Sequence, residues 1–487
     1  MRANIVIVQP KIGDMDMFLD NPTPPLGLLC AVSLVCRDLD VRLIDQRTEP
    51  DWRAALAAAI DARTAAVGIT CNVGGIIIKA LEAARAARRL TAAPIVWGGV
   101  GPSVIPEQIA AHELVDYLVE GEGEVAFAGL MRAIVSGADT GAIPGIWRKK
   151  DGKAKGVPRA ALLDLNALPM APYHLADMHK YMQSYLGEPM FSYQSSRGCP
   201  NVCGYCYNAV FNLGRWRGLP AERVIKELRE LKERYGFSLV YFLDDSFFVD
   251  QARAFRIFAG LKELGLGSVL QGVCTETLAR MSDADMDFLE GAGLRRISVG
   301  VDSGCDRIRS EIIKKKGDVR HVREQLARFR GRKIIFSCPM MIGLPTETRA
   351  EMMMTVDLAF EILKMGANFR VPQLLIYTPC PGTALYSMLE RSGVRFPSKL
   401  EDWAGYEVDF SRIHDAVPEH KELLESISFL SKFLDRKMED YNISSALVKI
   451  FYYTYQLIAR ARMKTGFVRP LPERAVYKFI KKRGVKN

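Results

Sequence analysis

The sequence contains no apolar run long enough to cross a membrane, and it has few histidines. No stretch approaches the roughly 18 apolar residues that a transmembrane helix needs, and residues 1–8 look like a buried strand rather than a secretion signal. Only six histidines are present. Ten cysteines without an export signal indicate a reducing compartment, where thiols more often bind metals than form disulfides. We therefore expect a cytoplasmic protein that is not integral to a membrane.

The excess of positive charge is confined to one segment. The chain has 66 Lys and Arg against 56 Asp and Glu, a formal net charge of +10. Residues 449–487 contain eleven basic residues and one acid, Glu473, so this segment alone carries a net charge of +10. Because the basic residues do not spread over the fold, the sequence predicts no nucleic-acid partner.

Three cysteines lie close together near the middle of the chain. Cys199, Cys203 and Cys206 form a C-x3-C-x2-C array on a loop rich in Gly, Pro and Asn. So tight a loop can turn three thiolates toward one point, which suits an iron–sulfur cluster with one iron left open. The alternatives are structural cysteines or a zinc site, which usually has a fourth Cys or His nearby. No histidine lies near this loop.

The array resembles the signature of radical S-adenosylmethionine (SAM) enzymes, which is C-x3-C-x-aromatic-C. Tyr205 is the aromatic residue here. The resemblance implies that Cys199, Cys203 and Cys206 hold a 4Fe-4S cluster whose open iron binds SAM. It also implies reductive cleavage of SAM to a 5′-deoxyadenosyl radical, which requires a reductant protein such as flavodoxin or ferredoxin.

Residues 1–140 alternate short β-branched runs with Ala-rich helical stretches. The predicted strands are 5–8, 41–45, 66–70, 95–97 and 117–119, and the predicted helices are 26–37, 53–62, 76–90 and 106–111. This alternation predicts a doubly wound, Rossmann-like α/β domain that binds ligands beyond the carboxyl ends of its strands. Glycines follow several of these strands, and glycine lets the backbone approach a ligand closely.

Placed ahead of the cysteine array, this domain resembles the cobalamin-binding domain of B12-dependent radical SAM enzymes. That family includes anaerobic Mg-protoporphyrin IX monomethyl ester cyclase and cobalamin-dependent radical SAM methyltransferases. The resemblance rests on Pro-Pro-Leu-Gly at 24–27, Gly-Gly-x-x-Pro at 98–102 and Gly-Glu-Gly-Glu at 121–124. It implies that cobalamin is bound by Thr70, Asn72, Gly74, Gly98, Gly99, Glu120, Gly121 and Glu122.

The domain lacks the Asp-x-His-x-x-Gly motif that supplies a histidine ligand in ordinary base-off cobalamin proteins. Members of the B12-dependent radical SAM family generally lack it too, so its absence does not argue against cobalamin. It implies a corrin whose lower face is open or is met by a side chain from residues 70–75. His112, in a helical context, is interpreted as a surface or capping histidine.

Residues 141–189 contain five prolines and a charged turn, which predict a linker with a small hairpin. Residues 190–392 then predict a second βα series. Its predicted strands are 193–196, 239–243, 269–273, 296–300, 334–341 and 373–377, and its helices are 222–235, 252–264, 283–292, 319–330 and 350–365. Six such units match the partial (β/α)6 barrel of radical SAM cores, where chemistry gathers at the carboxyl ends of the strands.

Two adjacent carboxylates, Asp244 and Asp245, end the second of these strands. Such a pair is costly to bury unless it receives hydrogen bonds or charge, and the cationic, hydroxyl-bearing SAM would supply both. The resemblance places the pair near the methionyl amine of SAM, while the alternative is a pair of helix-capping acids. By the same resemblance, further SAM-binding residues are Tyr205, Asp302, Ser303, Gly343 and Glu347. The remaining cysteines of this region are interpreted as buried small residues, with a functional thiol as the alternative; they are Cys274, Cys305, Cys338 and Cys380.

Residues 393–487 predict a helical, basic region that resembles no family. Aromatic residues stand beside basic ones within residues 446–465. Two interpretations remain open. One is a helix packed on the barrel with its basic residues in solvent. The other is a peripheral contact with a membrane surface or with an anionic, lipid-like substrate.

Taken together, the resemblances imply radical C-methylation of a small, apolar or lipid-like biosynthetic intermediate by way of methylcobalamin. The alternative is a cobalamin-assisted rearrangement or oxidative cyclisation without net methyl transfer. Either reaction requires a dry cleft between the two domains, because a primary carbon radical would be quenched by any available hydrogen donor.

Overall fold

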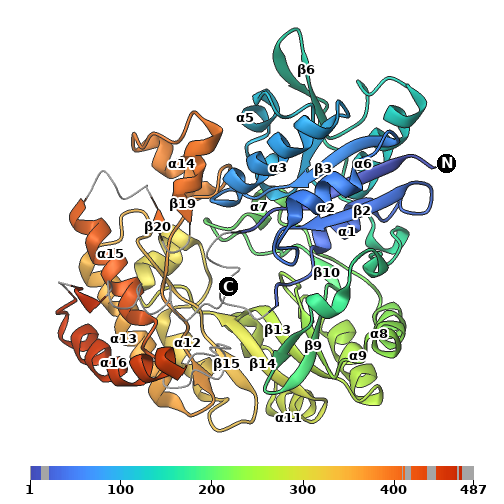
Figure 1. Ribbon diagram of the computed structural model, residues 1–487. Coiled ribbons are helices and arrows are strands. Elements are labelled where there is room, and N and C mark those ends of the chain that lie inside the picture. The colour runs from blue at the N-terminus through green and yellow to red at the C-terminus, as the bar shows by residue number, and fades with distance from the viewer. Residues whose placement is uncertain are drawn as a thin grey trace.

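The computed structural model describes residues 2–12, 21–407, 410–411, 418–435, 446–468 and 471–473. Within these ranges, two seven-stranded sheets organise the chain, one in the N-terminal part and one in the central part. Figure 1 shows the two sheets lying beside each other, with the C-terminal helices against the far side of the second one.

The N-terminal sheet is doubly wound, as predicted. Its described strands follow the order β2-β1-β3-β4-β5-β6-β7, and β1 to β5 are parallel. These five strands are β1 (Asn4–Gln9), β2 (Asp40–Asp45), β3 (Thr64–Thr70), β4 (Ile95–Gly98) and β5 (Tyr117–Val119). The covering helices are α1 (Leu26–Val32), α2 (Trp52–Ala59), α3 (Ile76–Leu90), α4 (Val100–Val104), α5 (Pro106–Ala111) and α6 (Gly123–Ser136). The strand order reverses between β1 and β3, and ligands of such sheets bind beyond the carboxyl ends of the strands at this point.

Three features of this domain differ from the sequence expectation. The first helix ends at Val32, and turns follow where the helix was expected to continue to residue 37. Helix α6 was not predicted, although it buries Phe127, Leu130 and Met131. The hairpin of β6 (Ile146–Lys150) and β7 (Lys153–Gly156) pairs antiparallel with β5, so the sheet extends beyond residue 140. The hairpin itself was expected, but its attachment to the sheet was not.

The central sheet is an open half barrel. Its described strands follow the order β17-β15-β14-β13-β12-β9-β8, and all but the edge strand β8 (Gln183–Tyr185) are parallel to their neighbours. The parallel strands are β9 (Glu188–Tyr193), β12 (Leu239–Phe242), β13 (Gly267–Cys274), β14 (Leu294–Gly300), β15 (Ile335–Ser337) and β17 (Phe369–Arg370). Helices α8 (Ala221–Tyr235), α9 (Gln251–Glu263), α11 (Asp283–Gly291), α12 (Val319–Ala327) and α13 (Arg349–Met365) alternate with them.

The two outer strands of the half barrel lie earlier in the sequence than expected. The first was expected at 193–196 and is β9, and the last was expected at 373–377 and is β17. The segment taken for the last strand instead contains β18 (Leu375–Ile376), which pairs with β16 (Met341–Ile342) at the carboxyl end of the barrel. Both segments are apolar, so the sequence alone does not separate them.

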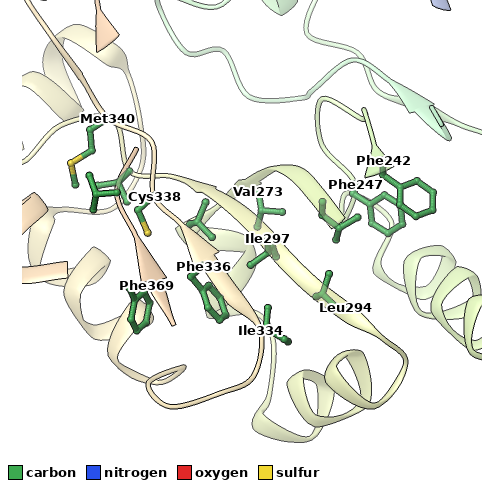
Figure 2. Packing of buried hydrophobic residues seen from close by; sticks show 14 of the residues in the cluster. Phe242, Phe247, Val273, Leu294, Ile297, Ile334, Phe336, Cys338, Met340 and Phe369 are labelled. Carbon is green, nitrogen blue, oxygen red and sulfur yellow. The ribbon is translucent and has the colours of Figure 1, made fainter. Parts of the chain in front are cut away.

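Aromatic and aliphatic side chains from neighbouring strands belong to one buried core that the half-barrel strands share with their covering helices (Figure 2). The rings of Phe336 and Phe369 lie 5.5 Å apart, and those of Phe242 and Phe247 lie 4.8 Å apart. Cys338 has no exposed surface in this core, which confirms its interpretation as a small buried residue.

The C-terminal region contacts both the N-terminal domain and the half-barrel domain. Segment η6 (Leu400–Gly405) returns to the N-terminal domain, where the indole Nε1 of Trp403 donates to Gln108 Oε1 at 2.7 Å. Helix α16 (Ala446–Thr465) packs on α13 and on α15 (Pro418–Ser431) through its buried aromatic residues, which agrees with the packing expected by the first interpretation of this region. That interpretation also placed the basic residues in solvent, whereas the Arg462 side chain is only 13% exposed and pairs with Glu473. No helix in the described ranges combines the length and the apolar character that crossing a bilayer requires.

Replacing Phe191 with Ala should destabilise the fold strongly. The ring has no exposed surface and lies 4.8 Å from Phe237 and 5.2 Å from Tyr173 of the linker. Removing a fully buried phenylalanine costs about 3–5 kcal/mol of unfolding free energy. The matched control is Phe288→Ala, because that ring is 37% exposed and should cost far less. Urea denaturation measures both, and equal losses would contradict this account of the core.

Candidate active site between the two domains

The three cysteines lie on the loop between β10 (Ser196–Arg197) and α7 (Asn208–Phe211), and each is partly buried. The backbone between them is held from both sides. The N–H of Gly204 donates to the carbonyl oxygen of Ile313 at 2.8 Å, and its carbonyl oxygen accepts from the N–H of Leu385 at 2.9 Å. These bonds tie the cluster loop, residues 198–207, to two later segments of the barrel.

Asp244 fixes the two serines, Ser195 and Ser196, that lie just before the cluster loop. Its carboxylate has no exposed surface and accepts from the N–H and Oγ of Ser195 at 3.0 and 2.7 Å, and from Oγ of Ser196. Burial raises the pKa of Asp244, although these hydrogen bonds favour its ionised form. The Arg253 guanidinium donates to the carbonyl oxygen and to Oγ of Ser195, both at 2.8 Å, and its positive charge compensates that of the Asp244 carboxylate. The side chain therefore faces the protein interior rather than a ligand.

Asp245 is placed differently from its neighbour. One of its oxygens accepts from the N–H of Gly198 at 2.8 Å, and the other accepts from the Tyr207 hydroxyl at 2.7 Å. Its carboxylate thus clamps the two ends of the cluster loop. Asp245 and Tyr207 also line the interdomain cavity described below, so this pair reaches a space where a ligand can lie.

Gly198 permits the tight turn before the first cysteine. Its φ angle is +85°, and a Cβ at this position would lie 1.9 Å from the carbonyl oxygen of Arg215. A side chain is therefore excluded by contact as well as by conformation. This requirement explains the glycine that precedes the cysteine array.

The donor set of the loop fits an iron–sulfur cluster. Three thiols come from one short segment, although within the described ranges no three Cys, His, Asp or Glu side chains already stand in an arrangement that holds a metal ion. Burial raises the pKa of each thiol, that of Cys203 to about 12. Thiols of this kind become thiolates when a metal displaces their protons. The three donors suit a four-iron cluster that keeps one iron open.

A charged network lies on the other side of the cysteines. The Tyr205 hydroxyl donates to Asp302 Oδ1 at 3.3 Å, and Lys315 Nζ lies 2.5 Å from Asp302 Oδ2. Asp302 has a φ of +68°, which is uncommon for a residue other than glycine. Its carboxylate thus connects the aromatic residue of the cysteine array to a buried lysine.

The remaining residues expected to bind SAM have internal partners. Ser303 is fully buried, and its hydroxyl accepts from the N–H of Cys305 at 3.2 Å. One oxygen of Glu347 accepts from the N–H groups of Gly343 and Leu344 at 2.6 and 3.1 Å. Burial raises the pKa of Glu347 to about 7. The other oxygen of Glu347 has no partner within the described chain.

A cavity of about 530 Å³ lies between the two domains. On the N-terminal side it is bounded by the carboxyl ends of β1, β3 and β4 and by the loop after β5, and on the barrel side by Arg197, Tyr207 and Asp245. The residues expected to bind cobalamin that line it are Thr70, Asn72, Gly98, Gly99, Gly121 and Glu122. Gly74 and Glu120 do not line it. Its volume is typical of cofactor pockets.

Gly99 and Gly101 have a structural reason to be glycines. A Cβ atom at Gly99 would lie 2.8 Å from the carbonyl oxygen of Cys71, and one at Gly101 would lie 2.8 Å from the backbone of Asn72. The loops after β3 and β4 therefore touch each other directly. This contact shapes one wall of the cavity, whereas the sequence had suggested only that the glycines make room for a ligand.

The acidic residues of the Gly-Glu-Gly-Glu segment form ion pairs across the domain boundary. Arg197, two residues before the first cysteine, lies 3.0 Å from Glu122 and 2.6 Å from Glu124. Arg217 lies 2.7 Å from the second oxygen of Glu122. Glu120 instead accepts from the indole of Trp147 at 2.7 Å. The carboxylates of Glu122 and Glu124 thus join the N-terminal domain to the cluster loop.

Sequence reasoning missed several residues of this site. Arg197 and Tyr207 flank the cysteine array, and that position is a signal that could have drawn attention to them. Lys315 stands in the middle of a run of three lysines, and nothing in the run distinguishes it from its neighbours. His112 ends helix α5 as a capping residue, which agrees with its interpretation.

Comparisons with known proteins agree with this two-domain arrangement. A family model of the radical SAM superfamily matches residues 193–359, and a model of the B12 binding domain matches residues 19–131. An uncharacterised methyltransferase of Pyrococcus horikoshii is 28% identical over 78% of this chain and 82% of its own length. The cytidylyl-2-hydroxyethylphosphonate methyltransferase of Streptomyces wedmorensis is 25% identical over 62% of each chain. The anaerobic magnesium-protoporphyrin IX monomethyl ester cyclase of Synechocystis is 29% identical over 47% of this chain and 46% of its own.

A solved structure has the same fold. The radical SAM methyltransferase TsrM from Kitasatospora setae, with tryptophan substrate and a SAM analogue bound, superposes with a TM-score of 0.68. The match covers 95% of this chain and 99% of that one at 18% sequence identity. At this identity the match shows the fold alone, a doubly wound α/β domain followed by an open half barrel.

The substitution Gly198→Ala should prevent iron binding. The positive φ alone costs about 1–3 kcal/mol for a non-glycine residue, and the clash with Arg215 would displace the loop. Gly214→Ala is the matched control, because its φ is +64° but the nearest atom to its Cβ, on Val202, is 3.7 Å away. Iron per chain after anaerobic reconstitution should fall only in Gly198→Ala. Equal iron in both variants would contradict the steric argument.

The substitution Glu122→Gln should loosen the domain boundary. Removing one partner of a buried ion pair costs about 3–5 kcal/mol, so amide hydrogen exchange near Arg197 and Arg217 should accelerate. Glu113→Gln, at an exposed position, should change nothing. Burial opposes the ionised form of Glu122, but its arginine partners outweigh this effect and hold its pKa below 4.5. The wild-type coupling should therefore persist above that pH and weaken only below it. Unchanged exchange in Glu122→Gln would show that the ion pairs do not couple the domains.

Proposed function

This chain belongs to the radical SAM superfamily and carries a B12-binding domain, and on that premise we propose that it is an enzyme that methylates carbon on a small molecule. The methyl group would come from SAM by way of cobalamin. The relatives that are named as methyltransferases support this reaction class.

The observation that carries the proposal is the shared cavity. Asp245 and Tyr207 reach it from the cluster loop, while the strand ends of the B12-binding domain form its opposite wall. Two cofactors held on opposite sides of one cavity could act on one substrate without releasing a reactive species into water.

We assign the cluster to Cys199, Cys203 and Cys206. When bound, the cluster supplies one electron for SAM cleavage and the cobalamin supplies a carrier for the methyl group. The carboxylate of Asp245 lines the cavity, so we propose that it orients the positively charged SAM. Asp302 is buried and paired with Lys315 and Tyr205, so its contact with SAM stays a prediction. Asp244 has no exposed surface, so its role is to position the loop. Ser303 has a similar internal role, and Glu347 supports the turn at Gly343.

For cobalamin, we propose contact with the six predicted residues that line the cavity. Asn72 is exposed and follows β3, so it is the side chain of the 70–75 segment that can reach the lower face of the corrin. Glu122 contributes to this wall while paired with Arg197 and Arg217. We also propose that the B12-binding domain includes the hairpin that ends at Gly156, because that hairpin continues its sheet.

Because one relative is a cyclase, a second reaction class is an alternative to methylation: a rearrangement or oxidative cyclisation without net methyl transfer. Product mass separates the two reactions, because methylation adds one CH2 and the alternative adds none. The structural relative TsrM binds tryptophan as its substrate. Candidate substrates to test should therefore include small aromatic and apolar acids. The expectation of a lipid-like substrate stays a prediction.

The substitution Cys203→Ala tests the assignment of the two cofactor sites. After anaerobic reconstitution with iron, sulfide and cobalamin, we expect the variant to lose the cluster absorbance and all SAM cleavage. It should keep the cobalamin spectrum, because Cys203 does not line the cavity. The control Cys36→Ala changes a thiol on the N-terminal domain and should behave as wild type.

Three outcomes would count against the proposal. If wild-type protein binds no cobalamin, the assignment of the cavity is wrong. If it binds both cofactors but leaves SAM intact after reduction, the protein is not a radical SAM enzyme in function. If SAM is cleaved without net methylation of any acceptor, the reaction belongs to the alternative class.

A further inference from the structure

A buried lysine lies beside the cluster loop and has no role in the function proposed above. Lys315 follows the π-helix η5 (Ile308–Ile313), which ends at Lys314 in a left-handed conformation with φ of +63°. The last carbonyl of this helix, on Ile313, accepts from the N–H of Gly204 at 2.8 Å. Since Gly204 directly follows Cys203, the segment that carries Lys315 is bonded to the cysteine array. Short π-helical turns are frequent at functional sites.

The side chain of Lys315 points inward, unlike those of its neighbours. It is only 9% exposed, and its ammonium lies 2.5 Å from Asp302 Oδ2 and 2.5 Å from the carbonyl oxygen of Gly300. Lys314 and Lys316 are exposed. Burial is the largest single effect and would lower the pKa of Lys315, but the charge and the hydrogen bond of Asp302, together with smaller effects, raise that pKa. The lysine therefore stays positively charged inside the protein.

The ion pair is connected to the cysteine array by a hydrogen bond. Asp302 accepts from the Lys315 ammonium through one carboxylate oxygen and from the Tyr205 hydroxyl through the other. Tyr205 lies between Cys203 and Cys206 in the sequence. The positive charge of Lys315 is therefore held next to the array that carries these two cysteines.

A role in stability alone does not account for this pair. Burying two opposite charges removes both from water, and the attraction between them often does no more than repay that cost. The barrel could fill the same space with apolar side chains, as it does throughout its core (Figure 2). The position of the charge beside a cysteine of the array is the feature that calls for an explanation.

We infer that Lys315 raises the reduction potential of the cluster held by Cys203, and so favours the one-electron reduction that precedes SAM cleavage. The inference rests on the cluster assignment proposed above. The electron comes from the reductant protein and adds one negative charge to the cluster. A fixed positive charge in a poorly solvated site stabilises that added charge, and net charge is one of the factors that set cluster potentials.

The test is a potentiometric titration of the full-length, reconstituted protein, followed by electron paramagnetic resonance and performed without SAM. We expect Lys315→Met to reduce the equilibrium constant for cluster reduction about tenfold, a shift of about 59 mV for a one-electron couple. Lys316→Met removes the same charge from an exposed side chain of the same run and should leave the potential unchanged. Lys315→Arg should restore it.

Substitution of the partner sharpens the test. Asp302→Asn leaves Lys315 uncompensated and should raise the potential. The double variant Lys315→Met/Asp302→Asn should have a higher potential than Lys315→Met, because it also removes the negative charge that Lys315→Met leaves behind. The double variant also leaves no unpaired buried charge, so it provides the measurement if Lys315→Met does not bind iron.

An unchanged potential in Lys315→Met, or an equal shift in Lys316→Met, would overturn the inference even if SAM cleavage falls. Such a fall at constant potential would mean that Lys315 acts on SAM and not on the cluster. Failure of the cluster assignment gives a different result, because the wild type would then bind no iron and show no reducible signal. Iron content therefore distinguishes the two failures.

Discussion

Two adjacent carboxylates at the end of one barrel strand fix the cluster loop in place. Asp244 is fully buried and bonded to the start of the loop, and Asp245 clamps both of its ends. A buried carboxylate is tolerated only when hydrogen bonds and charge satisfy it. Because the loop itself provides those hydrogen bonds, the loop and the strand determine each other. The path of the loop is thus fixed by hydrogen bonds within the protein.

The second constraint is the boundary between the domains. Arg197 directly precedes the cluster loop and pairs with two carboxylates of the B12-binding domain, while Arg217 pairs with one of them. Segment η6 adds a further contact, through Trp403 and Gln108. The two domains are therefore joined by residues near the start of the barrel sequence, Arg197 and Arg217, and by segment η6, which follows the barrel in the sequence. This arrangement keeps the two walls of the cavity in register, which a reaction between two cofactors requires.

Periodicity and glycine placement were sufficient to predict both parallel sheets from the sequence. They failed where two apolar segments compete, as at β17 and β18, and where a loop-like motif opens a helix, as at α6. The cysteine array and the paired carboxylates were recognisable because their types and spacing are unusual. The different roles of the two carboxylates could not be predicted, because Asp244 and Asp245 differ only in the direction in which each side chain points.

Charges that act across the chain were the least predictable features. Glu122 looked like a cofactor contact, yet its partners are arginines 75 and 95 residues away in sequence. Lys315 is one of three consecutive lysines, and only the turn after the π-helix decides which of them is buried. Such pairings depend on tertiary packing, and a local pattern does not encode them.

The central claim is that one protein passes a methyl group from SAM to cobalamin within a cavity shared by its two domains. The most direct measurement is to supply SAM with a deuterated methyl group to the reduced, cobalamin-loaded protein and to weigh the cobalamin by mass spectrometry. We predict trideuteromethyl-cobalamin together with S-adenosylhomocysteine. Unlabelled cobalamin, while the same sample cleaves SAM to deoxyadenosine, would contradict the claim.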